Sequence, residues 1–412
     1  MANKAIVPSV TQLHPTVRSL LAALFRLFRD RACRRQVWRW VFGSGGGIFA
    51  LLFLFKATGG FCRTPFETAQ LVAGVSWTLV RIVIQYIMRG FQPKFPKWTL
   101  RYELLHGLMR SAADMFGERI VEVQHARVIR YHSALFGTLL GCFARWQHSL
   151  KLESVHFNGL EHLWLRSSTC MNSQRERKRL VVLFFHGGGS LVGAIKQQLA
   201  SEDVDVDIFL ANYRKLPEYP FPVPAEDAVA MYQYLLQQEK VKPSQIIVAG
   251  DSAGGGLVLS TLLRLRDSTE KIPLPLAAIV MCPLADLTWG ENDKASEHCL
   301  VPLCMAAAIV LTYHPTRDDP STWADASPVH CDLRGLPPIF LQSATLDTLY
   351  QHSVRLEAKA VADGVNNWEV DVHEGVPHVF MVIPGYVLPY ARVGIQRIAT
   401  FAANQFTRAS NK

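Results

Sequence analysis

From about residue 150 onward, the pattern of hydrophobic and polar positions alternates between a strand-like and a helix-like form. Short, continuous apolar runs are typical of strands that are buried on both faces. We expect strands at 155–165, 180–185, 207–211, 245–249, 277–281, 338–342 and 369–373. Helical periodicity predicts helices between them, at 225–238, 254–266, 350–363 and 386–406. This alternation predicts an α/β fold, with a mostly parallel central sheet and helices on both faces.

The first 90 residues have a different pattern, in which apolar stretches follow a basic segment. Residues 41–55 carry no charge, and residues 68–88 are apolar except for Arg81. A helix that spans a membrane needs about 20 apolar residues. The first stretch reaches that length only if it extends back past Arg39. We expect a membrane anchor in 1–90, either spanning or interfacial; a buried cap helix and, less favoured, a cleaved signal are the alternatives.

Composition and charge support this division of the chain. Charged residues make up 19% of the sequence, whereas a soluble protein usually carries about 25%. Residues 1–60 hold nine Lys and Arg against a single acid, Asp30, out of a net charge of +9. The rest of the chain is nearly neutral, which argues against a nucleic-acid partner. The eight cysteines show no metal-binding spacing, and we expect most of them to be free, buried thiols.

A nucleophile motif lies between the predicted strand 245–249 and the helix that follows it. Residues 250–254 read Gly-Asp-Ser-Ala-Gly, which is G-x-S-x-G. A sharp strand-to-helix turn at this place would project the Ser252 hydroxyl over the helix N-terminus. Gly250 and Gly254 would let neighbouring backbone approach without a Cβ clash. The motif predicts Ser252 as a nucleophile; a phosphate-binding or turn-type glycine loop is the alternative.

A second glycine-rich motif, His186-Gly187-Gly188-Gly189, follows the predicted strand 180–185 directly. Three glycines in a row cost conformational entropy on folding. They are useful where backbone N–H groups must point at a ligand, as around the oxyanion of an acyl-transfer intermediate. We expect Gly187 and Gly188 to supply such donors together with Ala253; a simple glycine-rich turn is the alternative.

These motifs together resemble the hormone-sensitive-lipase-like family of α/β-hydrolases, which includes arylacetamide deacetylases and steryl acetyl hydrolases. The resemblance covers roughly 180–406 and includes the Tyr-Arg-Lys-Leu-Pro-Glu segment at 213–218. It implies an α/β-hydrolase fold with a helical cap, in which nucleophile, acid and histidine follow in that order along the chain. Because His186 precedes the nucleophile, it is interpreted as structural, and Gly189 and Asp251 as supports of their motifs.

The same chain order implies the positions of the acid and the base. Asp347 follows the predicted strand 338–342 and resembles the family's D-x-L element, although Gln351 stands where a second Asp is frequent. His378, in Gly-Val-Pro-His-Val-Phe, resembles the family's histidine loop. The implied triad is Ser252, Asp347 and His378, with no metal and no organic cofactor. The competing positions are Asp332, Asp363 and His373, which lie before a strand, inside a helix and within a strand.

The resemblance implies a carboxylic-ester hydrolase that cleaves short-acyl or acetyl esters of lipophilic molecules. An amidase, a peptidase or a secondary-metabolite hydrolase with the same mechanism remains an alternative. A ligand receptor on this fold, or a membrane scaffold with a vestigial hydrolase body, is disfavoured because His378 is retained.

We expect a basic N-terminus and anchor at 1–90, a helical cap or extension at 91–150, and a catalytic domain at 151–412 with a cap insertion at about 288–325. The basic flank before residues 41–55 predicts that a single span leaves the body on the lumenal side of the membrane, as in the anchored deacetylases that the chain resembles. We expect this membrane to be the endoplasmic reticulum. A second span at residues 68–88, which would return the chain to the cytosol as a hairpin, remains an alternative. The expected partners are a lipophilic ester and the membrane, and the sequence leaves the oligomeric state open.

Overall fold

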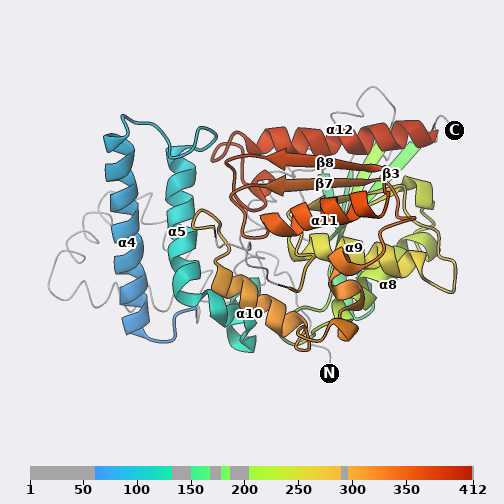
Figure 1. Cartoon of the computed structure of the whole chain (residues 1–412), viewed down its shortest axis with the longest axis horizontal. Helices are drawn as coiled ribbons and strands as arrows, with labels where there is room; N and C mark the ends of the chain where they lie inside the picture. The colour runs from blue at the N-terminus through green and yellow to red at the C-terminus, as the bar shows by residue number, and fades with distance from the viewer. Residues whose placement is uncertain (1–60, 132–149, 168–177, 186–203, 289–295, 411–412) are drawn as a thin grey trace.

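The computed structural model describes residues 61–131, 150–167, 178–185, 204–288 and 296–410 (Figure 1). Its strands form one sheet in the order β1-β2-β4-β3-β5-β6-β7-β8. β1 pairs with β2, and β2 with β4, in antiparallel fashion, while every other neighbouring pair is parallel. The predicted mostly parallel sheet is therefore confirmed. The strands are β1 (Leu150–Phe157), β2 (Leu160–Ser167), β3 (Lys178–Phe185), β4 (Val204–Ala211), β5 (Ile246–Asp251), β6 (Ala277–Met281), β7 (Ile339–Ala344) and β8 (Trp368–His373).

Helices cover both faces of this sheet, which explains why its strands read as continuous apolar runs. Along β3, Leu180 packs in one buried cluster with Ile398, whereas Val181 packs in a second cluster with Leu235 and Leu262. Figure 1 shows α12 on one side of the sheet and α8 and α9 on the other. The helices are α4 (Pro65–Met88), α5 (Leu100–Phe116), α8 (Val223–Gln237), α9 (Ala253–Arg266), α10 (Leu303–Tyr313), α11 (Tyr350–Ala362) and α12 (Ala391–Ser410), with a short 3-10 helix η1 (Gly117–Val121) after α5.

The single strand expected at 155–165 is wrong, because the chain reverses in the middle of it. Residues 155–157 end β1 and residues 160–165 belong to β2, and Phe157 pairs with Leu160 across the turn. The two turn residues, Asn158 and Gly159, have φ values of 51° and 72°. An Asn-Gly pair with positive φ at both positions forms the tight turn of a β-hairpin. The apolar run therefore continues across a turn rather than along one strand.

The last helix begins at Ala391 rather than at the expected residue 386. Proline disfavours a helical conformation in the residue before it, and Pro389 stands in the intervening segment. The remaining predicted strands and helices coincide with the observed ones to within a few residues at their ends.

The N-terminal helices α4 and α5 lie side by side, set apart from the sheet (Figure 1). Ser111 on α5 donates a hydrogen bond to Thr78 on α4 at 3.2 Å. Tyr102 on α5 is fully buried and belongs to the cluster beneath α12. In α4, by contrast, no residue of the most apolar window is buried, and the helix is long enough to cross a membrane. Residues 41–55, the basic segment before them and the glycines at 187–189 lie outside the described residues.

Candidate active site

The strand-to-helix turn after β5 holds Ser252 in a strained backbone conformation. Ser252 has φ 57° and ψ −121°, a combination that costs a non-glycine residue about 1–3 kcal/mol. Two backbone hydrogen bonds hold it there: the Ser252 N–H donates to the Met281 carbonyl at 2.9 Å, and the Leu284 N–H donates to the Ser252 carbonyl at 3.0 Å. The turn is thereby fixed to the end of β6.

Glycines around Ser252 allow backbone segments to approach closer than any side chain would permit. A Cβ added at Gly250 would lie 2.4 Å from the Gly254 carbonyl oxygen, and one at Gly254 would lie 2.3 Å from the Phe185 carbonyl oxygen. Gly256, which the sequence motif did not single out, is tighter still, because its Cβ would lie 2.0 Å from the Leu284 carbonyl oxygen. The close approach expected at Gly250 and Gly254 is present, and it extends two residues further along α9, to Gly256.

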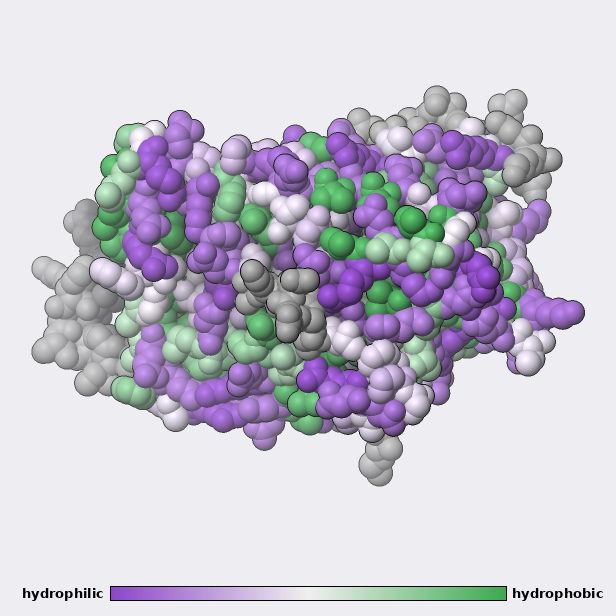
Figure 2. All heavy atoms as spheres, viewed as in Figure 1, coloured by the Kyte–Doolittle hydropathy of each residue, from purple (hydrophilic) through white to green (hydrophobic). Residues whose placement is uncertain are grey.

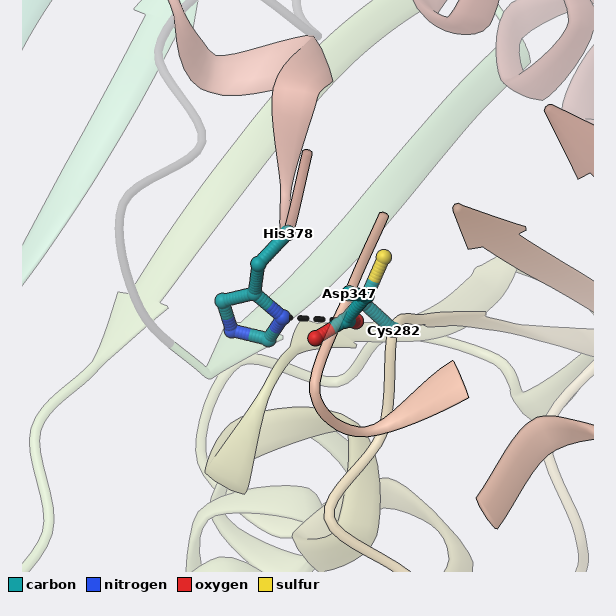
Figure 3. Close-up of side chains that lie close together, drawn as sticks. All are labelled: Cys282, Asp347 and His378. Carbon is teal, nitrogen blue, oxygen red and sulfur yellow. Dashed lines mark hydrogen bonds and ion pairs between the residues drawn. The ribbon is translucent and has the colours of Figure 1, made fainter. Parts of the chain in front are cut away.

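The structure brings Ser252, His378 and Asp347 into one hydrogen-bonded chain. His378 Nε2 lies 2.9 Å from Ser252 Oγ, and His378 Nδ1 lies 2.8 Å from Asp347 Oδ2. Figure 3 shows the ring of His378 directed at the Asp347 carboxylate. In the tautomer that carries its proton on Nδ1, the ring donates to Asp347 and accepts from the Ser252 hydroxyl. The side chains come from the segments that follow β5, β7 and β8, at the carboxyl edge of the parallel strands.

Local contacts fix the orientation of the Asp347 carboxylate. Its Oδ1 accepts a hydrogen bond from the Leu349 N–H at 2.9 Å and lies 3.6 Å from the Cys299 thiol, which donates to it. The loops that carry Asp347 and His378 are also joined, because the Gly375 N–H donates to Thr345 Oγ1 at 2.9 Å. Asp347 is 4% exposed, so its second oxygen is held toward the histidine in a dry environment.

The segment before α5 supports the histidine loop from outside the catalytic body. The indole Nε1 of Trp98 donates to the Gly375 carbonyl at 3.0 Å, and Lys97 Nζ donates to the Glu374 carbonyl at 2.8 Å. Both contacts join positions 277 residues apart in the chain. Sequence reasoning missed them, because no local pattern links these segments.

The competing residues named from the sequence lie elsewhere, each with partners of its own. His373 Nε2 is 2.7 Å from Asp371 Oδ2, and its Nδ1 is 3.1 Å from the Tyr390 hydroxyl. Asp332 pairs with Arg334 on the surface, and Asp363 accepts from the Leu333 N–H at 2.8 Å. Each of these residues therefore has a structural role in the described part of the chain.

One expected oxyanion donor, Ala253, is the exposed first residue of α9. The first N–H groups of a helix have no acceptor within it and are available to an anion. His186, Gly187, Gly188 and Gly189 lie outside the described residues. The strand that leads to them ends at Phe185, which pairs with Gly250 of the turn in the parallel register.

Comparison with known proteins agrees with this fold. A family model described as the alpha/beta hydrolase fold matches residues 182–382. An acetyl-hydrolase of Streptomyces hygroscopicus is 33% identical over 230 residues, which cover 53% of this chain and 74% of the relative. The chain belongs to the α/β-hydrolase family.

Two further relatives define the branch of the family. The crystal structure of an esterase from the bacterial hormone-sensitive lipase family is similar at a TM-score of 0.53 and 26% identity, over 80% of this chain and 98% of the other. The human protein named arylacetamide deacetylase-like 2 is 26% identical over 36% of this chain and 41% of that protein. The predicted resemblance to the hormone-sensitive-lipase-like α/β-hydrolases is confirmed, and the enzyme class is that of a carboxylic-ester hydrolase.

The electrostatics of the hydrolase site favour a basic imidazole. Burial lowers the pKa of His378, but the Asp347 carboxylate, through its charge and its hydrogen bond, together with the charge of Asp251, raises the pKa above its usual value. Burial in turn raises the pKa of Asp251 to about 6. Among the described residues, Asp251 Oδ1 is buried without a hydrogen-bond partner. Asp251 therefore acts on His378 through its charge rather than through contact.

Among the described residues, one group of side chains has the donor types and spacing of a metal site: Cys282, Asp347 and His378. Their donor atoms lie within 4.8 Å of one another (Figure 3). Burial, followed by the charge of Asp347, raises the pKa of the Cys282 thiol well above its usual value. A metal would need the thiolate, and the other two side chains already hydrogen-bond to each other. The arrangement therefore fits a hydrogen-bonded triad better than a metal centre. The described cysteines are free thiols, of which Cys304 is exposed and Cys331 half-buried.

A cavity of about 260 Å³ opens beside the turn that carries Ser252. Its wall is mostly apolar and is built by the start of α9, by η1 with the helical residues 123–131, and by α10. Representative lining residues are Ala253, Leu257, Ile120, Val121, Ile309 and Tyr313. An apolar space of this kind beside a nucleophile can hold the lipophilic part of an ester.

We expect Gly254→Ala to destabilise the hydrolase by about 1–3 kcal/mol, because the added Cβ must push against the Phe185 carbonyl. The matched control is Gly74→Ala in α4, where a Cβ would meet nothing within 4 Å and helix propensity improves. Chemical denaturation of both variants measures the difference. Equal stability of the two would contradict the close approach described for the turn.

We expect kcat/KM for a neutral ester to fall on the acidic side with an apparent pKa above the usual value for histidine, since only neutral His378 can accept a proton. Asp251→Asn removes a negative charge that raises the pKa of His378, so the acidic limb should move to lower pH. Kinetics between about pH 5 and 9 test this. A limb that stays in place, or that moves to higher pH, would show that Asp251 does not act on His378.

Proposed function

We propose that this hydrolase is a serine esterase that cleaves short-acyl or acetyl esters of lipophilic molecules through Ser252, His378 and Asp347. The observation that carries the proposal is the continuous hydrogen-bonded chain from Asp347 through His378 to Ser252, at a strained strand-to-helix turn. The acetyl-hydrolase of Streptomyces hygroscopicus supports the acetyl class of ester.

The proposed reaction begins when His378 Nε2 accepts the Ser252 proton, as the hydroxyl oxygen attacks the ester carbonyl. The Ala253 N–H, with N–H groups of Gly187 and Gly188, stabilises the oxyanion. His378 then gives its proton to the leaving alcohol. Water, activated by the same imidazole, releases the acid and restores Ser252. Asp347 holds the ring in the tautomer with a proton on Nδ1 and stabilises its charged form.

The apolar cavity supports a lipophilic substrate. Residues from η1, from positions 123–131 and from α10 line it opposite the start of α9. We propose that these segments act as the cap of the site, so that both the N-terminal extension and the insertion at about 288–325 contribute to it. The part of the ester that lies in the cavity would displace water from an apolar wall, which favours binding.

We propose that the membrane contacts the N-terminal part of the chain, with α4 lying in the interface and residues 41–55 as the span. Large apolar side chains of α4 are exposed, among them Phe66, Trp77, Ile84 and Met88, and Figure 2 shows apolar residues on the outer side of this helix. α4 is also held on the rest of the N-terminal extension, because Glu67 forms an ion pair with Arg119 of η1 at 2.9 Å. A helix that is held on its neighbours in this way suits the surface of a bilayer better than its centre.

Removal of the nucleophile should keep the fold and abolish turnover. We expect Ser252→Ala to lower kcat for a p-nitrophenyl ester by roughly 10⁴-fold or more, while the thermal unfolding curve stays close to that of the parent. His378→Ala and Asp347→Asn should each lower kcat severely. Combining either with Ser252→Ala should add little, because the three groups act as a unit.

The control for the acid is Asp332→Asn, which changes an exposed carboxylate that pairs with Arg334. It should leave kcat close to the parental value. If Asp332→Asn or Asp363→Asn abolished turnover and Asp347→Asn did not, the triad would contain a different carboxylate. Parental turnover in Ser252→Ala would reject the serine mechanism itself.

We also propose that the body faces the lumen of the endoplasmic reticulum, and one substitution can report it. The sequence contains no N-x-[ST] glycosylation site, and Asp267→Asn creates one before Ser268 and Thr269. The Asp267 side chain is 61% exposed at the end of α9. Expression in a eukaryotic cell should give a mass increase that an N-glycosidase removes.

Microsomes from the same cells test how the protein is attached to the membrane. We expect detergent, but not high salt, to release the hydrolase from microsomes, because apolar contacts resist salt and charge contacts do not. An unglycosylated protein whose body is degraded by protease in intact microsomes would place the body in the cytosol. Release by salt alone would reject the apolar anchor and leave only the basic N-terminal segment as the attachment.

A further inference from the structure

The apolar cavity beside Ser252 carries two cationic side chains in its wall. Lys215, from the segment 213–218, and Arg130, from the helical residues 123–131, are both among its lining residues. Cations in an apolar wall are costly unless they are paired, because burial removes their water. Their partners therefore show which charge in the cavity is already neutralised and which is open to a ligand.

The charge of Arg130 is matched within the protein. One terminal nitrogen of its guanidinium lies 2.8 Å from each carboxylate oxygen of Glu218. Arg127 lies 3.6 Å from the same carboxylate and adds a second cation to it. Glu218 is therefore shared between two arginines, and its single negative charge does not also neutralise Lys215.

The charge of Lys215 meets only neutral acceptors among the described residues. Its ammonium donates to the Tyr213 carbonyl at 3.0 Å and to the side-chain oxygen of Asn212, and it lies 4.6 Å from the centre of the Tyr213 ring. An ammonium has three N–H donors, so these two hydrogen bonds leave one donor for another acceptor. The negative charge of Asp227 raises the pKa of Lys215. That carboxylate is already bound by Arg214, however, whose Nη2 lies 2.7 Å from Asp227 Oδ1.

The surroundings of Lys215 disfavour its charge in the empty cavity. Burial, and then the charge of Arg130, lowers the pKa of Lys215 to about 8, while Asp227 offsets this in part. An anion that enters the cavity would oppose both causes, because it supplies the missing charge and the third acceptor. In an apolar pocket such a charge-assisted hydrogen bond is stronger than at the surface.

We infer that the cavity selects esters whose lipophilic part ends in a carboxylate, and that Lys215 binds this carboxylate while Ser252 attacks the ester at the other end. This inference rests on the proposed esterase function and names its substrate class, for which a monoester of a short dicarboxylic acid such as adipic acid is the simplest example. Apolar lining residues such as Leu257 and Ile309 contact the chain between the two ends. Lys215 is a specificity-determining residue in this arrangement and takes no part in proton transfer.

The test compares two chromogenic substrates with the same six-carbon acyl chain: 4-nitrophenyl hexanoate, which is neutral, and 4-nitrophenyl hydrogen adipate, which ends in a carboxylate. Full-length protein in a neutral detergent is used. The parent should prefer the adipate, mainly through a lower KM. In Lys215→Met the ratio of kcat/KM for adipate over hexanoate should fall about tenfold or more, because one hydrogen bond to a charged group is lost.

Two controls separate this loss from a folding defect. Lys215→Arg keeps the positive charge and should retain most of the preference. Lys242→Met removes an exposed lysine outside the cavity and should leave the ratio unchanged. A parent that discriminates against the adipate as strongly as Lys215→Met does would overturn the inference, and so would a Lys215→Met variant that keeps the parental ratio.

Binding without turnover separates this inference from the esterase proposal. The adipate monoester is titrated calorimetrically into Ser252→Ala and into Ser252→Ala combined with Lys215→Met. We expect about tenfold weaker binding, or more, to the double variant. If the parent hydrolyses neither ester but this difference appears, the esterase proposal fails and the carboxylate site stands. If both esters are hydrolysed and the two variants bind the adipate equally, the esterase proposal stands and the carboxylate site is rejected.

Discussion

The strained turn at Ser252 is the constraint on which the rest of the structure depends. A non-glycine residue keeps φ 57° only if its surroundings hold it there, and here glycines let backbone close in around it. Gly254 lies against the end of β3 and Gly256 against the segment after β6. The helix α9 therefore starts directly beneath the sheet edge, and this sets both the direction of the Ser252 hydroxyl and the floor of the cavity.

The N-terminal extension connects three parts of the molecule that are distant in sequence. Its helix α5 enters the core through Tyr102, and Trp98 and Lys97 hold the loop that carries His378. Further along, η1 forms part of the cavity wall. The exposed apolar helix α4 packs on α5. The same segment thus lies against the loop of the proposed base, the apolar cavity and the surface proposed to meet the membrane, so that under the proposed function a lipophilic ester would have a short path from the bilayer to Ser252.

Several buried acids in the described part of this hydrolase are paired, and the kind of partner separates structural acids from the candidate catalytic acid. Asp227 is bound by Arg214, which fixes the segment 213–218 on α8. Asp371 is bound by His373 inside β8. Asp347 has a histidine too, but that histidine also reaches a hydroxyl at a strained turn. The same carboxylate–imidazole pair is therefore structural in one place and poised for chemistry in another, and the difference is the group on the far side of the ring.

The sequence by itself determined the α/β alternation and placed Ser252 directly after a strand, because apolar periodicity and glycine spacing are local properties of the chain. The positions of Asp347 and His378 came from the resemblance to the hydrolase family, which fixes the chain order of the three residues. The sequence also contained the Asn158–Gly159 turn, although the apolar run around it favoured a single strand. Only the tertiary structure decided which neighbours these residues have. The support of the His378 loop by Trp98 and the unmatched charge of Lys215 arise where segments far apart in the chain meet, and no local pattern records such contacts, because they depend on how the helices and loops pack around the sheet.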